Sequence, residues 1–315
     1  MKRLTCVIQI GPNEFKQVTD IKIKSSYESL TDSAVITIPR KISFGESPVA
    51  RDSPIFKVGD PVRIFLGYDG DNKLLFTGFA TGIKPGPPIE ITCEDEMYML
   101  KKQVVSKSWP KPVSLPDFLK EIITGYDVVA ENVNLGKIRM DATPAAKLNE
   151  FSQTHSIKSF IRNGTLYSGR AYWKELQNPK IPVFQFQNNI ITHDLQWQNK
   201  SDVHIQVKAV STLRNNKKIV EVVGDAGGTL RTLNYYDLDS DQLKKNAQRD
   251  LDRFKFTGFK GSFTTFGEQV VLHGDKVNLI DPVIRERSGT YIAKSIERTF
   301  GSSGYRQKIG LEALV

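Results

Sequence analysis

The segment KVGDPVRIFLG at residues 57–67 has a near copy later in the chain, LHGDKVNLID at residues 272–281. Each segment contains a Gly-Asp pair followed by apolar residues at alternate positions. Glycine adopts turn angles that other residues avoid, and residues two positions apart face the same side of a strand. Both segments therefore predict a tight turn that leads into a strand with one buried face.

The likeness continues beyond the turns and indicates an internal repeat. The first copy reads GDPVRIFL, FATGIK and IEITCE, and the second reads GDKVNLID, IAKSIE and KIGLEA in the same order. The offsets between matching residues stay between 213 and 218 positions. We therefore interpret Gly59, Asp60, Gly274 and Asp275 as the turns that define two related β units. The chain contains four Gly-Asp pairs, so a chance match remains an alternative.

The first hundred residues consist of strand-length runs in which apolar and polar residues alternate. Turn-forming residues interrupt these runs, as in DGDN at 69–72 and PGPP at 85–88. Such spacing is typical of a β barrel or sandwich. The predicted strands are LTCVIQI, DIKIKSSYES, SAVITIP, PVRIFLGY, LLFTGFATGI and IEITCE. A short helix in EDEMYMLKKQ closes this first unit.

A different pattern begins near residue 105. SLPDFLKEIITGY has Ser114 as a helix N-cap and apolar residues at helical spacing, and it stops at Gly125. TPAAKLNEFSQTH predicts a second helix, and Asn163-Gly164 in IKSFIRNGTLYSG predicts a hairpin with a type I′ turn. These elements indicate a small α/β insert.

Strand patterns return by about residue 181 and continue to the end. One amphipathic helix is predicted at 240–256, because Leu243, Ala247, Leu251 and Phe254 fall on one face, which we expect to contact a core. We therefore predict a mainly β protein with an α+β insert. Its three domains are a β barrel at 1–105, the insert at 106–180 and a second β barrel at 181–315.

Composition and charge are those of a globular protein. The chain is 39% apolar and 25% charged, so it can bury a core without a partner. No run of about 18 apolar residues is present, and the N-terminus lacks the apolar region of a signal peptide, so we expect synthesis in the cytoplasm and no membrane insertion. The net charge of +9 is dispersed and favours a solvated surface. Cys6 and Cys93 lie in strand-like runs and are expected to be buried thiols.

No pattern in the sequence indicates catalysis or a bound cofactor. The four histidines stand apart from one another and from the two cysteines, without the spacing of zinc ligands, and no paired acids or oriented nucleophile is evident. We therefore expect no catalytic, cofactor-binding or metal site. The histidines are His155, His193, His204 and His273.

Two local patterns have simpler structural explanations. Asp237-Leu-Asp239-Ser-Asp241 begins like a calcium loop, but Gln242 and Gln248 replace the required glycine and glutamate, so we expect Asp239 or Ser240 to cap a helix. RDLDRFKFTGFKGSFTTF at 249–266 mixes cations with aromatic rings, as in a groove for single-stranded nucleic acid. We expect its rings to pack in the core and its cations to face water.

The order of these motifs resembles a known family. The residues that carry the likeness are IKIKSSYESLTDSAVITIPR at 21–40, VGDPVRIFLGY with FTGFATGI within 58–83, PAAKLNEFSQTHSIKSFIRNGTLYSG at 144–169, and HGDKVNLID with GTYIAKSIERTF near the end. Together they resemble the baseplate hub proteins of contractile phage tails, often called late control protein D. The hub part of VgrG-type spikes of type VI secretion is related to these proteins.

The resemblance implies a structural, non-enzymatic protein with two tail-tube-like β barrels around the α/β insert. It implies a homotrimer in which six similar barrels join a sixfold tail tube, or a tube-initiating ring, to a threefold spike. Because the sequence ends at Val315 directly after a strand, we expect the spike to be a separate protein. The implied location is the tail baseplate of a virion or injection machine, after synthesis in the cytoplasm of a bacterial host, with no small-molecule substrate.

Two other functions remain open. A tail-associated peptidoglycan-degrading enzyme would need a cleft with converging carboxylates. A two-barrel nucleic-acid-binding protein would bind single strands with an affinity that falls steeply with salt.

Overall fold

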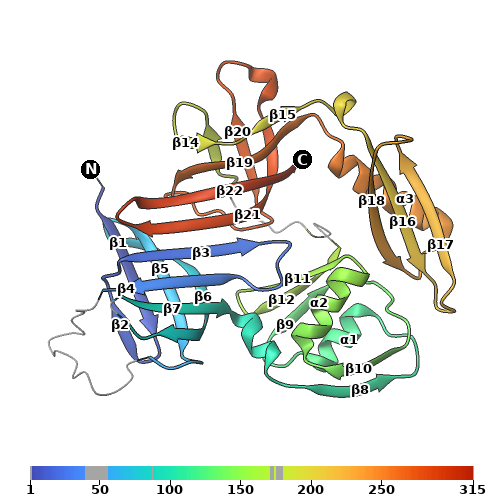
Figure 1. The fold of residues 1–315 in the computed structure, drawn as a ribbon, viewed down its shortest axis with the longest axis horizontal. Helices are drawn as coiled ribbons and strands as arrows, with labels where there is room; N and C mark the ends of the chain where they lie inside the picture. The colour runs from blue at the N-terminus through green and yellow to red at the C-terminus, as the bar shows by residue number, and fades with distance from the viewer. Residues whose placement is uncertain (1, 40–55, 87, 171–173, 175–179, 315) are drawn as a thin grey trace.

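The computed structural model describes residues 2–39, 56–86, 88–170, 174 and 180–314. The described residues form a mainly β fold with a few helices, as the sequence predicts. Figure 1 shows its parts: the first β unit beside the α/β insert, and the second β unit next to both. An outer layer of three strands and a helix lies at the end of the second β unit, away from the first.

The first β unit follows the alternation of its sequence closely. In β1, for example, Cys6, Ile8 and Ile10 are buried, while the residues between them are partly exposed. The inward side chains form one apolar core. Its strands are β1 (Leu4–Ile10), β2 (Asn13–Phe15), β3 (Asp20–Ser26), β4 (Ser33–Ile38), β5 (Pro61–Tyr68), β6 (Asp71–Lys84) and β7 (Ile89–Asp95).

The insert begins after a short 3₁₀ helix, η1 (Glu96–Lys101), where the sequence predicts a short helix. Ser114 caps α1 by accepting the Asp117 N–H at 3.2 Å, as predicted. Asn163 and Gly164 both have positive φ, 52° and 74°, which a type I′ hairpin turn requires. The remaining elements are β8 (Val105–Trp109), α1 (Leu115–Ile122), β9 (Asp127–Ala130), β10 (Ile138–Ala142), α2 (Pro144–Thr154), β11 (Ile157–Arg162) and β12 (Thr165–Arg170).

The second β unit is interrupted by the outer layer. Its strands are β13 (Val183–Gln185), β14 (Ile190–His193), β15 (Gln196–Gln198), β19 (Gly258–Phe266), β20 (Lys276–Ile280), β21 (Gly289–Gly301) and β22 (Gly304–Leu314). Two single-turn 3₁₀ helices, η2 (Lys200–Asp202) and η3 (Arg285–Arg287), lie in its loops. The unit encloses an apolar core of its own.

The outer layer comprises β16 (Ile205–Thr212), β17 (Lys218–Gly224), β18 (Thr229–Tyr236) and α3 (Ser240–Phe254). Asp239 and Gln242 form a capping box at the start of α3, so the predicted cap is confirmed. Leu243, Ala247 and Leu251 are buried, which confirms the expected core contact. They pack on the sheet of β16–β18, in a core distinct from that of the second β unit.

Within the described part of the chain, one main sheet of 14 strands connects the two β units. Its link is the antiparallel pairing of β3 with β21, from Asp20 opposite Gly301 to Ser26 opposite Ser295. Phe300 and Tyr305, at the tip of the β21–β22 hairpin, belong to the core of the first β unit. The second β unit therefore completes the first, a connection that the sequence did not indicate.

The division of the chain into domains at residues 105 and 180 stays a prediction. The main sheet runs through both β units, and residues 175–179, near the expected second boundary, lie outside the described residues.

Cys6 and Cys93 are buried free thiols, as expected. Burial raises their pKa values to about 11 and about 12.

Candidate functional site

The two Gly-Asp turns have matching hydrogen bonds. Gly59 donates its N–H to the carbonyl oxygen of Ala80 at 2.7 Å, and Gly274 donates to that of Ala293 at 2.7 Å. Each alanine N–H donates back to the carbonyl oxygen of the turn aspartate at 2.9 Å. The glycines have φ of +94° and +84°, a region in which glycine avoids steric strain.

The aspartate side chains of the two turns also accept equivalent hydrogen bonds. The Asp60 carboxylate accepts the N–H of Lys57 at 2.8 Å, and the Asp275 carboxylate accepts the N–H of Leu272 at 2.8 Å. In both turns the aspartate side chain therefore accepts a hydrogen bond from the residue three positions earlier in the chain, which closes the turn. The four sequence-predicted turn residues thus form two separate sites with one geometry.

The strand order of the two β units also matches. The first unit has the order β1-β5-β6-β7-β4-β3, and the second has β13-β20-β21-β22-β19 followed by β14 and β15. The register shifts after Ala80 in β6 and after Ala293 in β21, so a β-bulge occupies the same place in both units. One pairing differs, because β1 is antiparallel to β5 whereas β13 is parallel to β20.

The surroundings of the two turns differ. Asp60 is partly exposed, whereas Asp275 is 5% exposed and lies 3.7 Å from the guanidinium of Arg162. Arg162 ends β11 of the insert and also donates to the carbonyl oxygen of His273 at 2.6 Å. The insert is therefore anchored to the turn of the second unit by a charged side chain.

Arg162 and His273 line a cavity of about 410 Å³ where the insert and both β units meet. Asp32 and Asp95 of the first unit also line it, and each donates its backbone N–H to the other residue. Burial raises the pKa of Asp32 to about 6 and that of Asp95 to about 8, and the Asp32 charge adds to the shift of Asp95. The cavity thus holds carboxyls that ionise near neutral pH.

Arg298 brings a fully buried cation to the same cavity. Its guanidinium donates to the carbonyl oxygen of Val271, while its Nε and the Nδ1 of His273 have no hydrogen-bond partner among the described residues. Burial lowers the pKa of His273 to about 3, and the charges of Arg162 and Arg298 act in the same direction. His273 is therefore neutral at pH 7. Its ring packs edge-on against Phe160, with centroids 4.8 Å apart.

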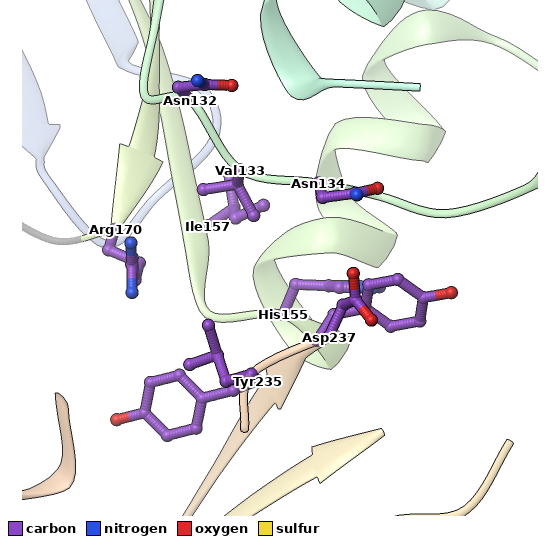
Figure 2. Close-up of a pocket in the computed structure, with 10 residues that line it drawn as sticks. Asn132, Val133, Asn134, His155, Ile157, Arg170, Tyr235 and Asp237 are labelled. Carbon is purple, nitrogen blue, oxygen red and sulfur yellow. The ribbon is translucent and has the colours of Figure 1, made fainter. Parts of the chain in front are cut away.

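A smaller cavity of about 130 Å³ separates the insert from the outer layer. Figure 2 shows His155 and Arg170 of the insert around the end of β18, where Tyr235 and Asp237 lie. Arg170 bridges the two parts, since it donates to Glu131 at 2.9 Å and to Asn246 of α3 at 2.8 Å. Among the described residues that line this cavity, Asp237 is the only carboxylate, so they bring no pair of acids together there.

The other sequence candidates do not form a chemical centre. His193 and His204 are exposed, and within the described residues no three His, Cys, Asp or Glu side chains gather as a metal site would require. Among the described helices, none has the length and apolar character needed to cross a membrane.

In the aromatic stretch at 249–266, Phe259 and Phe263 are buried as expected, but Phe266 is 42% exposed. Lys255 does not face water freely, because it forms an ion pair with Asp225. Lys260 is exposed, as predicted.

Sequence reasoning missed the charged cluster at the larger cavity. One signal was present: Ile296, Arg298 and Phe300 alternate along β21, and all three are buried. A cation at an inward position of an apolar strand face indicates a buried polar contact. Nothing in the local sequence of Arg162 or Asp32 indicates that they lie near it.

Comparison with known proteins gives a likeness of fold. No family model matches the chain, and no curated protein matches it. A tail protein from Neisseria meningitidis superposes with a TM-score of 0.71 at 16% identity, over 98% of this chain and 96% of that one. The prophage MuSo2 tail protein from Shewanella oneidensis gives 0.65 at 14% identity, over 99% and 100%.

An Escherichia coli protein gives a TM-score of 0.59 at 9% identity, over 98% of this chain and 77% of that one. That protein is described as a component of the type VI secretion system with structural similarity to bacteriophage T4 tail proteins. The likeness expected from the sequence is therefore confirmed at the level of the fold.

Proposed function

We propose that this chain is a ring-forming structural hub in the baseplate of a phage tail or a related contractile injection machine. The observation that carries the proposal is the match between the two β units in turn geometry, bulge position and strand order. A chain that contains two similar units can build a ring with twice as many units as chains.

The proposed assembly is a homotrimer with six similar β units around a channel. Such a ring fits a sixfold tail tube, or a tube-initiating ring, on one side and a threefold spike protein on the other. In this proposal the ring-forming domains are residues 1–105 and 181–315, and the insert at 106–180 lies between them in the chain. Gly59, Asp60, Gly274 and Asp275 are the turns shared by the two ring-forming domains.

The proposed role is mechanical and non-enzymatic. It is supported by the fold shared with phage tail proteins and by cavity linings in which charged groups engage one another. Two partly buried cations join different parts of the chain: Arg162 links the insert to His273 and Asp275 of the second β unit, and Arg170 links the insert to Asn246 of α3. The expected location is the tail baseplate.

Static light scattering over a range of concentrations tests this proposal, with and without a spike protein encoded by a neighbouring reading frame. We expect a species with the mass of three chains, and ring-shaped particles in negative-stain electron microscopy. A chain that stays monomeric with every spike candidate, or that binds oligonucleotides in a salt-dependent manner, would overturn it.

A further inference from the structure

Within one chain, the hairpin of the second β unit lies along the outer strand of the first. β21 pairs with β3 in seven register positions, from Ser295 opposite Ser26 to Gly301 opposite Asp20. An ion pair between Glu297 and Lys22, at 2.7 Å, reinforces this contact. Because the two β units are alike, each side of this contact has a counterpart in the other unit, and two chains could form the same contact through these counterparts.

The counterpart of β3 in the second unit is the segment Thr192–Gln198, which comprises the end of β14 and β15. Lys24 of β3 pairs with Ser33 of β4, and Gln196 pairs with Lys260 of β19. Ser33 and Lys260 are equivalent positions in the two units. The residue directly after each of them pairs with an equivalent position in the next strand of the sheet, which is β7 in the first unit and β22 in the second. Gln196 therefore corresponds to Lys24.

This counterpart edge has no strand against its outer side among the described residues, since β14 and β15 pair with β19 alone. Thr192, His193, Asp194 and Gln196 are exposed, and neighbouring Ile191 is 40% exposed. An uncovered edge strand offers backbone groups to another chain.

The part of β21 that pairs with β3 corresponds to Gly82–Lys84 at the end of β6 in the first unit. The match follows from the bulges, since Ala80 corresponds to Ala293 and Gly82 to Ser295. β5 pairs with β6 only as far as Phe79, so no described strand covers that side of Gly82–Lys84. The β6–β7 hairpin is also shorter, because its pairing ends at Lys84 opposite Glu90.

The charges at the two counterpart segments are complementary. Lys84 occupies the place of Glu297, and Asp194, two positions before Gln196, occupies that of Lys22. Two chains that made the same contact would thus reproduce this ion pair with its signs exchanged. Both side chains are exposed, and each already has a partner within the chain: Lys84 lies 2.5 Å from Glu90, while Asp194 lies 3.4 Å from Lys308 and also accepts hydrogen bonds from Ser262.

We infer that Gly82–Lys84 of one copy of this chain pairs with the Thr192–Gln198 edge of a second copy. The inference rests on the proposed ring and names its contact between chains. The register transferred from β21 and β3 places Gly82 opposite Gln198, Ile83 opposite Trp197 and Lys84 opposite Gln196. Only three positions pair, against seven inside the chain.

Disulfide trapping in the full-length protein tests this register. We expect the double variant Lys84→Cys with Gln196→Cys to form disulfide-linked dimers and trimers on mild oxidation, because opposed residues of paired strands lie within disulfide range. Lys84→Cys with Thr192→Cys is the matched control. Thr192 lies on the same edge but about 13 Å further along it, beyond disulfide range. Each single-cysteine variant controls for the buried Cys6 and Cys93.

The outcomes separate this inference from the proposed function. Trimers by light scattering without a preferred Lys84–Gln196 disulfide would overturn the inference and leave the ring standing. A register-specific disulfide ladder that extends beyond three chains would support the edge contact and overturn the trimer. Because trapping collects even transient encounters, a chain that remains monomeric and unlinked at high concentration would overturn both.

Discussion

The Arg162 guanidinium lies 3.7 Å from the Asp275 carboxylate, and the two side chains are only 15% and 7% exposed. Arg162 belongs to the insert, and Asp275 closes the repeated turn of the second β unit. A cation and an anion that are both withdrawn from water depend on each other, because either alone would carry an uncompensated desolvation cost. This pair therefore ties the insert to the main sheet.

Replacing Arg162 should loosen that connection. Arg162→Ala removes a cationic partner of the buried Asp275 carboxylate and the donor to the His273 carbonyl oxygen. We expect a loss of about 3 kcal/mol in the free energy of unfolding, measured with urea. Arg139→Ala, which removes an exposed arginine from β10, is the control and should change stability by less than about 0.5 kcal/mol. Equal effects of the two variants would contradict the proposed anchor.

The raised pKa of Asp95 should appear as a pH dependence of stability. Its native pKa is about 8 against a model value of 3.8, so between these values the native state holds a proton that the unfolded state has released. Stability must then fall as pH rises through this window. His273 acts with the opposite sign, but only below pH 6.5, because its pKa is lowered.

Asp95→Asn isolates this contribution above pH 6.5. The variant cannot titrate, so its stability should fall less steeply than that of the natural protein between pH 6.5 and pH 8. The test is the slope of stability against pH and not the absolute stability. The substitution also removes one of the two N–H bonds that the carboxylate accepts from Asp32 and Met97, which changes the absolute value. Asp71→Asn, at the exposed start of β6, should leave the slope unchanged. Parallel curves for all three proteins would refute a raised pKa at Asp95.

Phe300 tests whether the second β unit completes the first. The residue belongs to β21 but packs in the core of the first β unit, where it is 6% exposed. Phe300→Ala should destabilise the protein by about 3 kcal/mol. Hydrogen exchange should show faster exchange in β3 and β4, although the substitution lies in the other unit. Phe266→Ala is the control, because Phe266 is 42% exposed on β19. Faster exchange confined to β21 and β22 would argue against shared stability.

The two turn glycines should respond alike to substitution. Gly59→Ala and Gly274→Ala each place a side chain at a φ of +94° or +84°. We expect each variant to lose about 1–2 kcal/mol, the cost of the left-handed region for a residue with a Cβ atom. Gly86→Ala is the control, since its Cβ would meet nothing closer than 3.8 Å. A cost at only one of the two turns would show that the repeat is not structurally equivalent.

Local patterns in the sequence predicted most elements of this fold. The alternation in LTCVIQI became β1, Ser114 capped α1, and Asn163-Gly164 formed the hairpin turn. Each of these features depends on residues close together in the chain, so their backbone preferences and apolar spacing can be recognised in a short segment of sequence. The capping of α3 by Asp239 could be predicted for the same reason.

The cluster at the larger cavity could not be predicted in this way. Arg162, Asp275 and Asp32 come from three different parts of the chain, and no spacing in the sequence relates them. The role of α3 was foreseen only in part. Its apolar face indicated a core contact, but a hydrophobic stripe does not specify which sheet it covers.

The sequence by itself determined the repeated units, because turn glycines and alternating apolar residues dictate strands from one residue to the next. Tertiary structure alone decided that β3 joins β21 and that a hairpin tip enters the neighbouring core. Backbone hydrogen bonds make the β3–β21 link, and every residue except proline offers the same donor and acceptor. The choice of partner strand therefore emerges only when the whole chain packs.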